Sequence, residues 1–318
     1  MQKVDHKGEF EAIVETFECG GGNSAVFGKP DASFLVVSGN TVLTKNVGKG
    51  VEIDITEGDE EVEVFLSVGD NRTIERPVHL CFGVVKPEGR QYIRSRYTIG
   101  NNASVRFLAH CSFPRAEDVL HVMDADIAIG ENSVVRYNEV HFHGPEGGIE
   151  VVPKGKVSVG TRSSFFSEFK IVDGAVGRFD MDYNVSVGAH GVAELIAKLY
   201  GKKEDRIKIK ESIYLNGNYS RGIAKTRIVN KDSSKSEVLG EVIGNGDHAR
   251  GHIDCTEIIE GECAEARAVP LIKVTNPLAK VTHEAAIGSV DKNQVETLMA
   301  RGLEENEAID MIVRGILK

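Results

Sequence analysis

Short runs of apolar residues, many alternating with polar ones, dominate the first third of the chain. Residues 34–37, 51–55 and 62–66 are examples, and they are separated by stretches that contain Gly, Asn and Asp. A two-residue period between such turn-forming residues is typical of β-strands. We therefore predict β-structure from about residue 33 to residue 96, preceded by an irregular lead-in over residues 1–30 with a flexible Gly20–Asn23 stretch.

A looser pattern recurs between residues 97 and 275. A corner that contains Gly, Asn or Ser is followed by alternating small and β-branched residues, as at residues 99–107, 129–137, 154–159, 172–179 and 215–219. The spacing of roughly two to three tens of residues is typical of solenoid coils, which stack about 4.8 Å apart. The pattern favours a mainly β chain with a parallel β-helix core over residues 97–290, and an antiparallel β-sandwich is the alternative.

The C-terminal segment, residues 291–318, changes to a helical period. Asp291 can cap a helix over residues 292–301, which Gly302 would end. A second helix over residues 304–317 has a single apolar stripe. That stripe consists of Ile309, Ile312, Val313 and Ile316. Such a helical hairpin either caps the solenoid or docks on a partner, and the sequence leaves both open.

Composition and charge narrow the classes of function. The 34 Gly, 8 Pro and absence of Trp suit short strands around an aliphatic core, and the net charge of -10 argues against a nucleic-acid partner. Neither a signal peptide in residues 1–15 nor an apolar run of roughly 20 residues is present, so we expect a cytoplasmic protein without a membrane partner. The five cysteines form no C-x-x-C pair, which argues against a disulfide framework or a zinc ribbon.

Two pairs of side chains are candidates for chemistry on the predicted strands. His141 and His143 would share one strand face as a possible metal pair, but no third ligand is near in sequence. Asp124 and Asp126 would share a face as in acid-using polysaccharide enzymes. Because the chain has no Trp to form a sugar platform, a solvated strand face is the preferred interpretation of the two aspartates.

A third group has mixed ligand chemistry. Cys255 is followed 29 residues later by Glu284, next to His283. If the coils have about that length, the two sites would stack on neighbouring coils. A thiolate, an imidazole and a carboxylate together form a mixed soft and hard ligand set. Spacing alone leaves open both a metal site and an incidental arrangement.

Several segments resemble the SufB/SufD family of iron–sulfur cluster assembly scaffold proteins. Residues 277–286 (Pro-Leu-Ala-Lys-Val-Thr-His-Glu-Ala-Ala), with the helix that ends in Arg301-Gly302, resemble the C-terminal signature of SufB. Residues 107–114 resemble the family's Gly-Cys-Ser-x-Pro segment, and residues 218–222 and 252–255 follow in the expected order. The resemblance covers about residues 70–318.

The resemblance implies a right-handed parallel β-helix and a scaffold rather than an enzyme. It implies a SufC ATPase bound to the C-terminal helices and a transient iron–sulfur cluster. Cys111 matches a cysteine implicated in receiving persulfide sulfur, and His110 beside it with the nearby Arg115 would favour the thiolate form. Cys255 and Glu284 match residues implicated in holding the cluster, and His283 matches a SufD histidine. A chain with both partners' ligands suggests a homodimer; the alternative is a structural, SufD-like subunit that binds SufC without holding a cluster.

Overall fold

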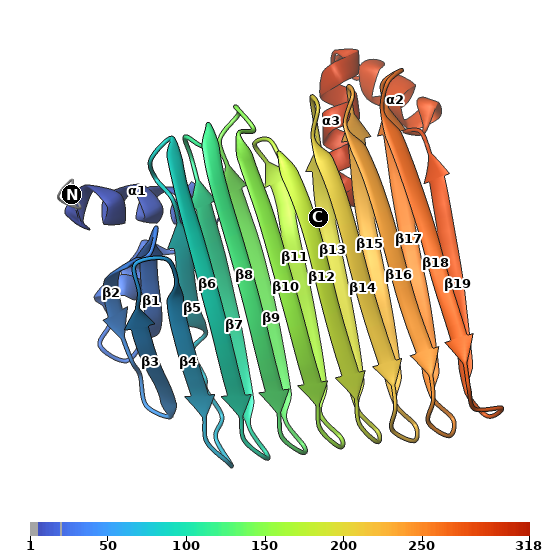
Figure 1. Cartoon of the computed structure of the whole chain (residues 1–318). Helices are drawn as coiled ribbons and strands as arrows, with labels where there is room; N and C mark the ends of the chain where they lie inside the picture. Colours follow the sequence, from blue (N-terminus) through green and yellow to red (C-terminus); the bar gives the residue numbers. More distant parts are fainter. Residues whose placement is uncertain (1–5, 20) are drawn as a thin grey trace.

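The computed structural model describes residues 6–19 and 21–318, so expectations for residues 1–5 and Gly20 lie outside it. The described chain is mainly β and forms a parallel β-solenoid of about 8 turns, with two sheets facing each other (Figure 1). The mainly β solenoid with C-terminal helices is confirmed, and the β-sandwich alternative is wrong, because successive coils pair in parallel.

The two sheets take alternate strands of the chain. Sheet A, in spatial order, contains β19 (Lys280–Gly288), β17 (Arg250–Glu260), β15 (Arg221–Lys231), β13 (Val192–Gly201), β11 (Ser164–Asp173), β9 (Val134–His143), β7 (Ser104–Phe113), β5 (Val78–Gly83), β1 (Ser33–Ser38) and β2 (Thr41–Asn46). Sheet B contains β18 (Glu265–Val274), β16 (Lys235–Gly244), β14 (Arg206–Leu215), β12 (Arg178–Val187), β10 (Ile149–Val159), β8 (Asp118–Ile129), β6 (Glu88–Ile99), β4 (Val62–Val68) and β3 (Val51–Glu57).

The corners of the coils explain the recurring Gly, Asn and Ser residues. Asn102 and Asn132 adopt the left-handed conformation, each with φ of 54°, which asparagine tolerates better than most residues. The Ser133 hydroxyl accepts a 2.9 Å hydrogen bond from the Ala103 amide, 30 residues earlier, and donates to the Gly100 carbonyl. Ser163 repeats the arrangement one coil later. These bonds satisfy buried backbone groups between coils and fix the coil length near 30 residues.

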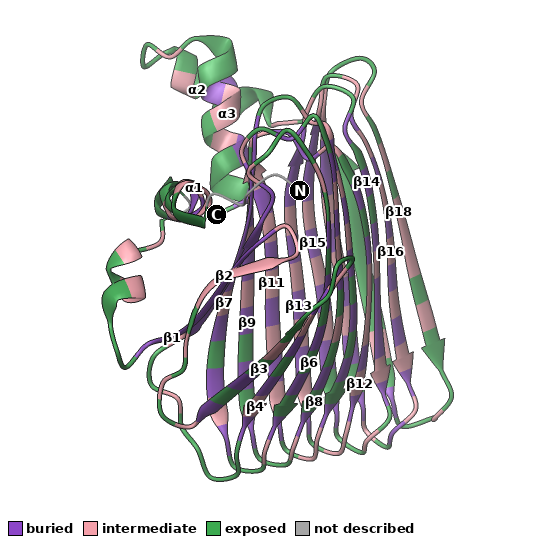
Figure 2. Cartoon of the chain, turned by 60° about the vertical axis from the view of Figure 1, so that its left-hand side comes forward, coloured by how far each residue is buried: buried purple, intermediate pink, exposed green. Residues whose placement is uncertain are grey.

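The N-terminal lead-in is not irregular, contrary to the expectation. Helix α1 (His6–Cys19) and the short 3₁₀ helix η1 (Ser24–Gly28) precede β1. The buried side chains Ile13 and Phe17 of α1 pack with Val36 and Cys81, so the helix covers the outer face of sheet A near its N-terminal end (Figure 2). The helix forms because this apolar side finds a sheet surface to cover.

Two helices follow the last strand, as predicted. Helix α2 (Lys292–Met299) is capped by Asp291, whose carboxylate accepts a 2.8 Å hydrogen bond from the Asn293 amide. It ends two residues earlier than expected, and Gly302 then turns the chain with φ of 98°. Helix α3 (Glu305–Ile316) begins with a capping box between Glu304 and Glu307.

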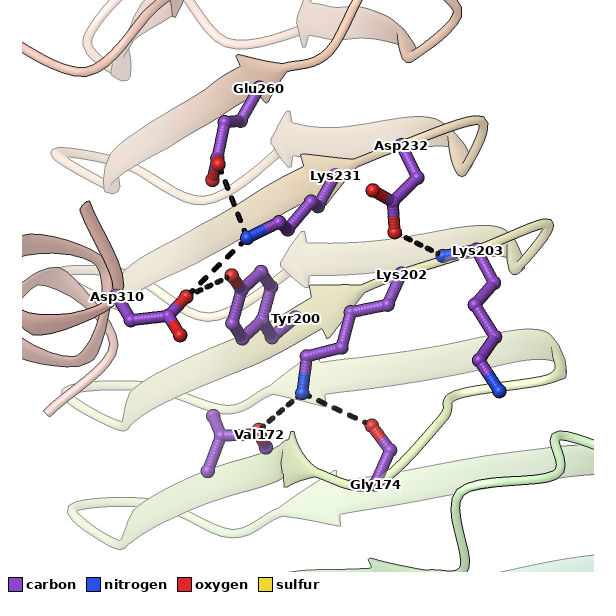
Figure 3. A network of polar contacts seen from close by, with 9 residues as sticks. All are labelled: Val172, Gly174, Tyr200, Lys202, Lys203, Lys231, Asp232, Glu260 and Asp310. Carbon is purple, nitrogen blue, oxygen red and sulfur yellow. Dashed lines mark hydrogen bonds and ion pairs between the residues drawn. The ribbon is translucent and has the colours of Figure 1, made fainter. Parts of the chain in front are cut away.

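Helix α3 packs on the outer face of sheet A. Val313 and Leu317 form an apolar cluster with Tyr200 of β13, Val229 of β15 and Ile258 of β17. The Tyr200 hydroxyl donates a 2.9 Å hydrogen bond to Asp310, which also lies 3.7 Å from the Lys231 ammonium (Figure 3). The helices therefore lie beside the last coils and do not cap them, and within the described chain β18 and β19 each keep one unpaired edge.

Candidate metal centre at the open end of the solenoid

Cys255 lies on β17, one coil before the end of the solenoid. Its side chain points inward, because Gly251, Ile253, Cys255 and Glu257 are buried while the residues between them are partly exposed. Cys255 pairs in register with Thr226 of β15 on one side and with Ala285 of β19 on the other. Only 3% of the residue is exposed. In the described part of sheet A, β19 is the one strand that lies between Cys255 and the open end of the solenoid.

The surroundings of Cys255 are acidic. Its sulfur lies 3.9 Å from Oε1 of Glu257, whose second oxygen accepts a hydrogen bond from Ser236. Glu211 accepts a 3.4 Å hydrogen bond from Thr226, the residue of β15 that pairs with Cys255. Burial, followed by the negative charges of Glu257 and Glu211, raises the pKa of the Cys255 thiol to about 12. The thiol is therefore protonated at neutral pH unless a cation replaces its proton.

The two glutamates were missed by the sequence analysis. Burial raises the pKa of Glu211 to about 8 and also raises the pKa of Glu257. The signal for Glu257 was present, because a residue two positions after Cys255 on a strand lies on the same face. Glu211 lies on β14 in the opposite sheet, so only the stacking of the two sheets reveals it.

The structure places His283 on the same face as Cys255. His283 pairs with Ile253 and Ala285 pairs with Cys255, so His283 lies diagonally across from Cys255 on the neighbouring coil. From the strand spacing and the rise per residue, the two Cα atoms are roughly 8 Å apart. His283 is exposed because no further coil covers β19 within the described chain.

Glu284 faces the other way. It pairs with Asp254, which lies in the outward column of β17 and forms a 2.6 Å ion pair with Arg227. The Arg227 guanidinium holds the pKa of Asp254 below its ordinary value. The structure thus brings Cys255 and His283 to one face of sheet A and turns Glu284 to the opposite face.

The last coil also exposes large apolar side chains. They are Leu271 and Val274 on β18, Leu278 in the following corner and Ile287 on β19. Ile287 pairs with the inward-facing Glu257, so its exposure results from the open end rather than from an outward orientation. Unpaired strand edges beside exposed apolar side chains are a surface suited to protein–protein contact.

Cys111 lies far from this end, on β7, and is fully buried in the interior. Burial, with a smaller contribution from Glu139, raises the pKa of its thiol well above the ordinary value. The expected help from His110 is wrong, because the adjacent position points to the outer face, where its ring contacts Phe17 of α1. Burial lowers the pKa of His110 to about 4, so at neutral pH the imidazole is uncharged.

The aspartate pair on β8 belongs to a charged strand surface. Asp124 pairs in register with Arg94 on β6 and Lys154 on β10. Asp126 likewise pairs with Arg96 and Lys156. These exposed charges of alternating sign across three coils are typical of a solvated sheet face.

Comparison with known proteins decides the family. The family model described as "SUF system FeS cluster assembly, SufBD core domain" matches residues 85–316. The chain belongs to the SufBD family. The resemblance found in the sequence is thereby confirmed, although the matched region begins somewhat later than the expected residue 70.

Three SufBD relatives illustrate the similarity. An iron–sulfur cluster assembly SufBD family protein of Pyrococcus horikoshii is 34% identical over 99% of this chain and 95% of its own length. A second, from Methanocaldococcus jannaschii, is 34% identical over 89% of each chain. The iron–sulfur cluster assembly protein SufB of Bacillus subtilis is 25% identical over 80% of this chain and 55% of its own length. Among the described residues, no helix of this SufBD protein has the length and apolar character that crossing a membrane requires.

Proposed function

We propose that this chain is a cytoplasmic, non-enzymatic scaffold subunit of a SUF-type assembly complex. In this proposal two copies meet at their open ends and hold a nascent iron–sulfur cluster between them, while a SufC-like ATPase docks on α2 and α3. The observation that carries the proposal is the open end of the solenoid, where Cys255 on β17 and His283 on β19 share a face beside exposed apolar side chains. Membership of the SufBD family supports the general role in cluster assembly.

The proposed ligand set of each copy is Cys255, His283 and Glu284. Clusters that stay in place are usually held by four thiolates. One thiol and one imidazole from each chain form a weaker grip, which suits a scaffold that must release its cluster. A two-fold axis would double each contribution. Glu284 faces away from Cys255 of its own chain. It would therefore bind the cluster only together with ligands of the second copy.

Iron binding would change the protonation of this end. The thiol of Cys255 must lose its proton to bind iron, and the metal's charge supplies the compensation that the free protein lacks. The negative charges of the neighbouring Glu257 and Glu211 would then stabilise the iron-bound form of the site relative to the metal-free form with its protonated thiol. Loading should therefore release protons and become tighter as pH rises towards 8, where Glu211 ionises.

Cys111 remains the proposed sulfur acceptor on the strength of the resemblance. Since its thiol is buried and protonated, sulfur would have to enter the solenoid and meet a group that removes the proton. The nearest base on its own strand, His110, does not perform that task, because its ring lies on the other face.

The ATPase would dock on the outer surface of the helical pair. Helix α3 is held to sheet A by its buried side, which leaves Met299 of α2 and Met311 and Ile316 of α3 exposed. Methionine adapts its shape to a partner and is frequent on such surfaces. We expect the Met311→Asp substitution to weaken ATPase binding at least tenfold without unfolding the solenoid, as measured by titration calorimetry.

Anaerobic reconstitution with ferrous iron and sulfide tests the cluster claim. We expect charge-transfer absorbance that falls at least twofold in Cys255→Ala and in Glu284→Ala. Cys263→Ala is the matched control, since that thiol belongs to the same coil but is exposed on a corner. Equal cluster yield in the wild-type, Cys255→Ala and Glu284→Ala proteins would contradict the ligand assignment.

A second candidate is a structural, SufD-like subunit that docks the ATPase and holds no cluster. The burial of Cys255 and the outward orientation of Glu284 favour it. It predicts that ATPase binding survives Cys255→Ala and is lost when residues 291–318 are deleted, with no cluster formed by the wild-type protein.

A further inference from the structure

A group of ligand-type side chains lies inside the middle of the solenoid, away from the open end. Cys111 on β7, His121 on β8, and Glu139, His141 and His143 on β9 are all buried. Cys111 pairs in register with His141, while His121 reaches in from sheet B. Of these residues, only Cys111 has a part in the proposed function.

The hydrogen bonds of this group define where the protons are. Nδ1 of His143 lies 2.8 Å from the Ala175 carbonyl and must donate to it, which leaves a lone pair on Nε2. That nitrogen lies 3.3 Å from Nδ1 of His141, which therefore donates. His141 then has its own lone pair on Nε2, 2.7 Å from Oε1 of Glu139. Glu139 must supply the proton between them.

The protonation states agree with this chain of donors. Burial lowers the pKa of His141 and of His143 to about 3, so both rings are neutral at pH 7. Burial raises the pKa of Glu139 to about 8, so this carboxyl group keeps its proton. The chain of hydrogen bonds thus ends at Nε2 of His141, whose lone pair accepts the proton of the Glu139 carboxyl group. A cation bound beside these two groups can replace that proton.

His121 is the unsatisfied member of the group. It is 0% exposed, and among the residues that the structure describes neither of its ring nitrogens has a hydrogen-bond partner. A buried polar group without a partner is unfavourable and calls for an explanation. One ligand atom from each of Cys111, His121 and His141 lies within 4.8 Å of the other two. The three residues come from both sheets and converge on one point in the interior.

We propose that Cys111, His121 and His141, with Glu139 as the fourth ligand, bind one divalent transition-metal ion, either Zn²⁺ or Fe²⁺. Around a tetrahedral ion with ordinary metal–ligand distances, ligand atoms are about 3.5 Å apart. The three side chains therefore need to close by about 1 Å. Both ions accept thiolate and imidazole nitrogen, so the ligand set defines the chemistry without choosing between them.

The site is electrically balanced once the ion is bound. The Cys111 thiol and the Glu139 carboxyl group each lose one proton to solvent, and the two resulting negative charges match the charge of the ion. A neutral site suits its apolar walls, formed by Phe113, 4.9 Å from the His121 ring, and Phe169, 4.8 Å from the His141 ring. His143 keeps its hydrogen bond from Nδ1 of His141 and so orients Nε2 towards the ion, as residues behind metal ligands commonly do.

This site is independent of the proposed cluster site, because Cys255, His283 and Glu284 take no part in it. It bears on Cys111 in one way. A thiolate bound to the ion is deprotonated but engaged, so sulfur acceptance and metal binding exclude each other while the ion is present.

Refolding the full chain with metal tests the inference. The Cys255→Ser protein, which lacks the thiol of the open end, is unfolded with a chelator and refolded anaerobically with one equivalent of Zn²⁺, Fe²⁺ or Co²⁺. We expect about one ion per chain after gel filtration, and visible bands of tetrahedral Co²⁺ with a thiolate charge-transfer band. The Zn²⁺ and Fe²⁺ arms show which ion the site prefers.

Variants separate the interior site from adventitious binding. Cys111→Ser and His121→Gln should each lower the affinity at least tenfold, and Cys111→Ser should remove the charge-transfer band. Cys81→Ser is the matched control, a buried thiol of sheet A that faces α1. No ion in the refolded parent protein, an octahedral Co²⁺ spectrum, or undiminished binding by folded His121→Gln would overturn the inference. If a variant does not fold, His143→Gln replaces it, with the same tenfold loss expected.

Discussion

Glu211 shows how burial controls single residues in this protein. Its carboxyl group lies inside the solenoid, and burial raises its pKa from the ordinary 4.5 to about 8. The folded state therefore holds a proton that the unfolded state releases near pH 4.5. The contribution of this proton to the stability of the fold is fully present below pH 4.5. It declines above that pH and is lost as pH rises through about 8. At about 1.4 kcal/mol per pKa unit, the loss reaches roughly 5 kcal/mol.

Urea unfolding between pH 5 and pH 9 measures this effect. We expect the wild-type free energy of unfolding to fall across the range and Glu211→Gln to remove only part of that fall, because burial also raises the pKa of Glu139 to about 8 and this group contributes a similar share. Glu241→Gln is the control for loss of a carboxylate at a half-buried position on β16. The same pH dependence in Glu211→Gln and in the wild-type protein would contradict the assignment.

The five thiols should differ in reactivity in the metal-free protein. Cys19 and Cys263 are exposed, whereas Cys81, Cys111 and Cys255 are buried. Burial raises the pKa of Cys81 and of Cys255 to about 12. Because the thiolate is the reactive species, we expect iodoacetamide to label the exposed pair at least tenfold faster. Mass spectrometry of peptides measures the order, and labelling of Cys255 as fast as Cys263 would show that the last coil opens.

Residues were predictable where a local rule applied. The 29-residue offset from Cys255 to Glu284 placed both Glu284 and the adjacent His283 on the next coil, because the coil length is close to that offset. The strict two-residue alternation of a strand, however, sends the adjacent Glu284 to the opposite face, which the offset alone does not reveal. His121 was not predictable as a partner of Cys111 and His141, because it reaches the interior from the other sheet.

At the scale of elements, helix α3 is divided into a docked and an exposed side. Val313 is fully buried against sheet A, whereas Met311 is 53% exposed. We expect Val313→Ala to lower the free energy of unfolding by about 2 kcal/mol and to speed hydrogen exchange in α3. Met311→Ala should change the free energy of unfolding by less than about 0.5 kcal/mol. Equal effects of the two substitutions would show that α3 is not docked as described.

The helices also show which features of an element can be predicted from its own sequence. Asp291 and Gly302 are local signals, and they fixed the ends of α2 to within two residues. The apolar stripe of α3 did not reveal its docking surface, because Ile316 belongs to the stripe and stays exposed. Helix α1 was missed, although Phe10, Ile13 and Phe17 recur with helical spacing, because the sheet surface that makes them useful forms only in the folded protein.

For the whole molecule, the repeated corners were sufficient to predict a solenoid. Each coil buries its interior on the next, so the chain stacks until no further coil follows. Parallel pairing already begins with β1 and β5 and with β4 and β6, upstream of the recurring corners. The sequence could not decide whether the C-terminal helices cap the last coil, because that depends on the surface to which they bind. In the structure α3 packs on the outer face of sheet A, and the last strands β18 and β19 therefore stay uncovered at the end of the solenoid.

Size-exclusion chromatography with light scattering and an iron assay tests the central claim, a cluster held between two copies. Ile287→Asp puts a charge on the open end and leaves Cys255 intact, and Val134→Asp is the control at an exposed valine in mid-solenoid. We expect the wild-type and Val134→Asp proteins to carry iron and sulfide in a dimer peak. Ile287→Asp should run as a folded monomer with little iron. A monomer that retains the full cluster would contradict the account.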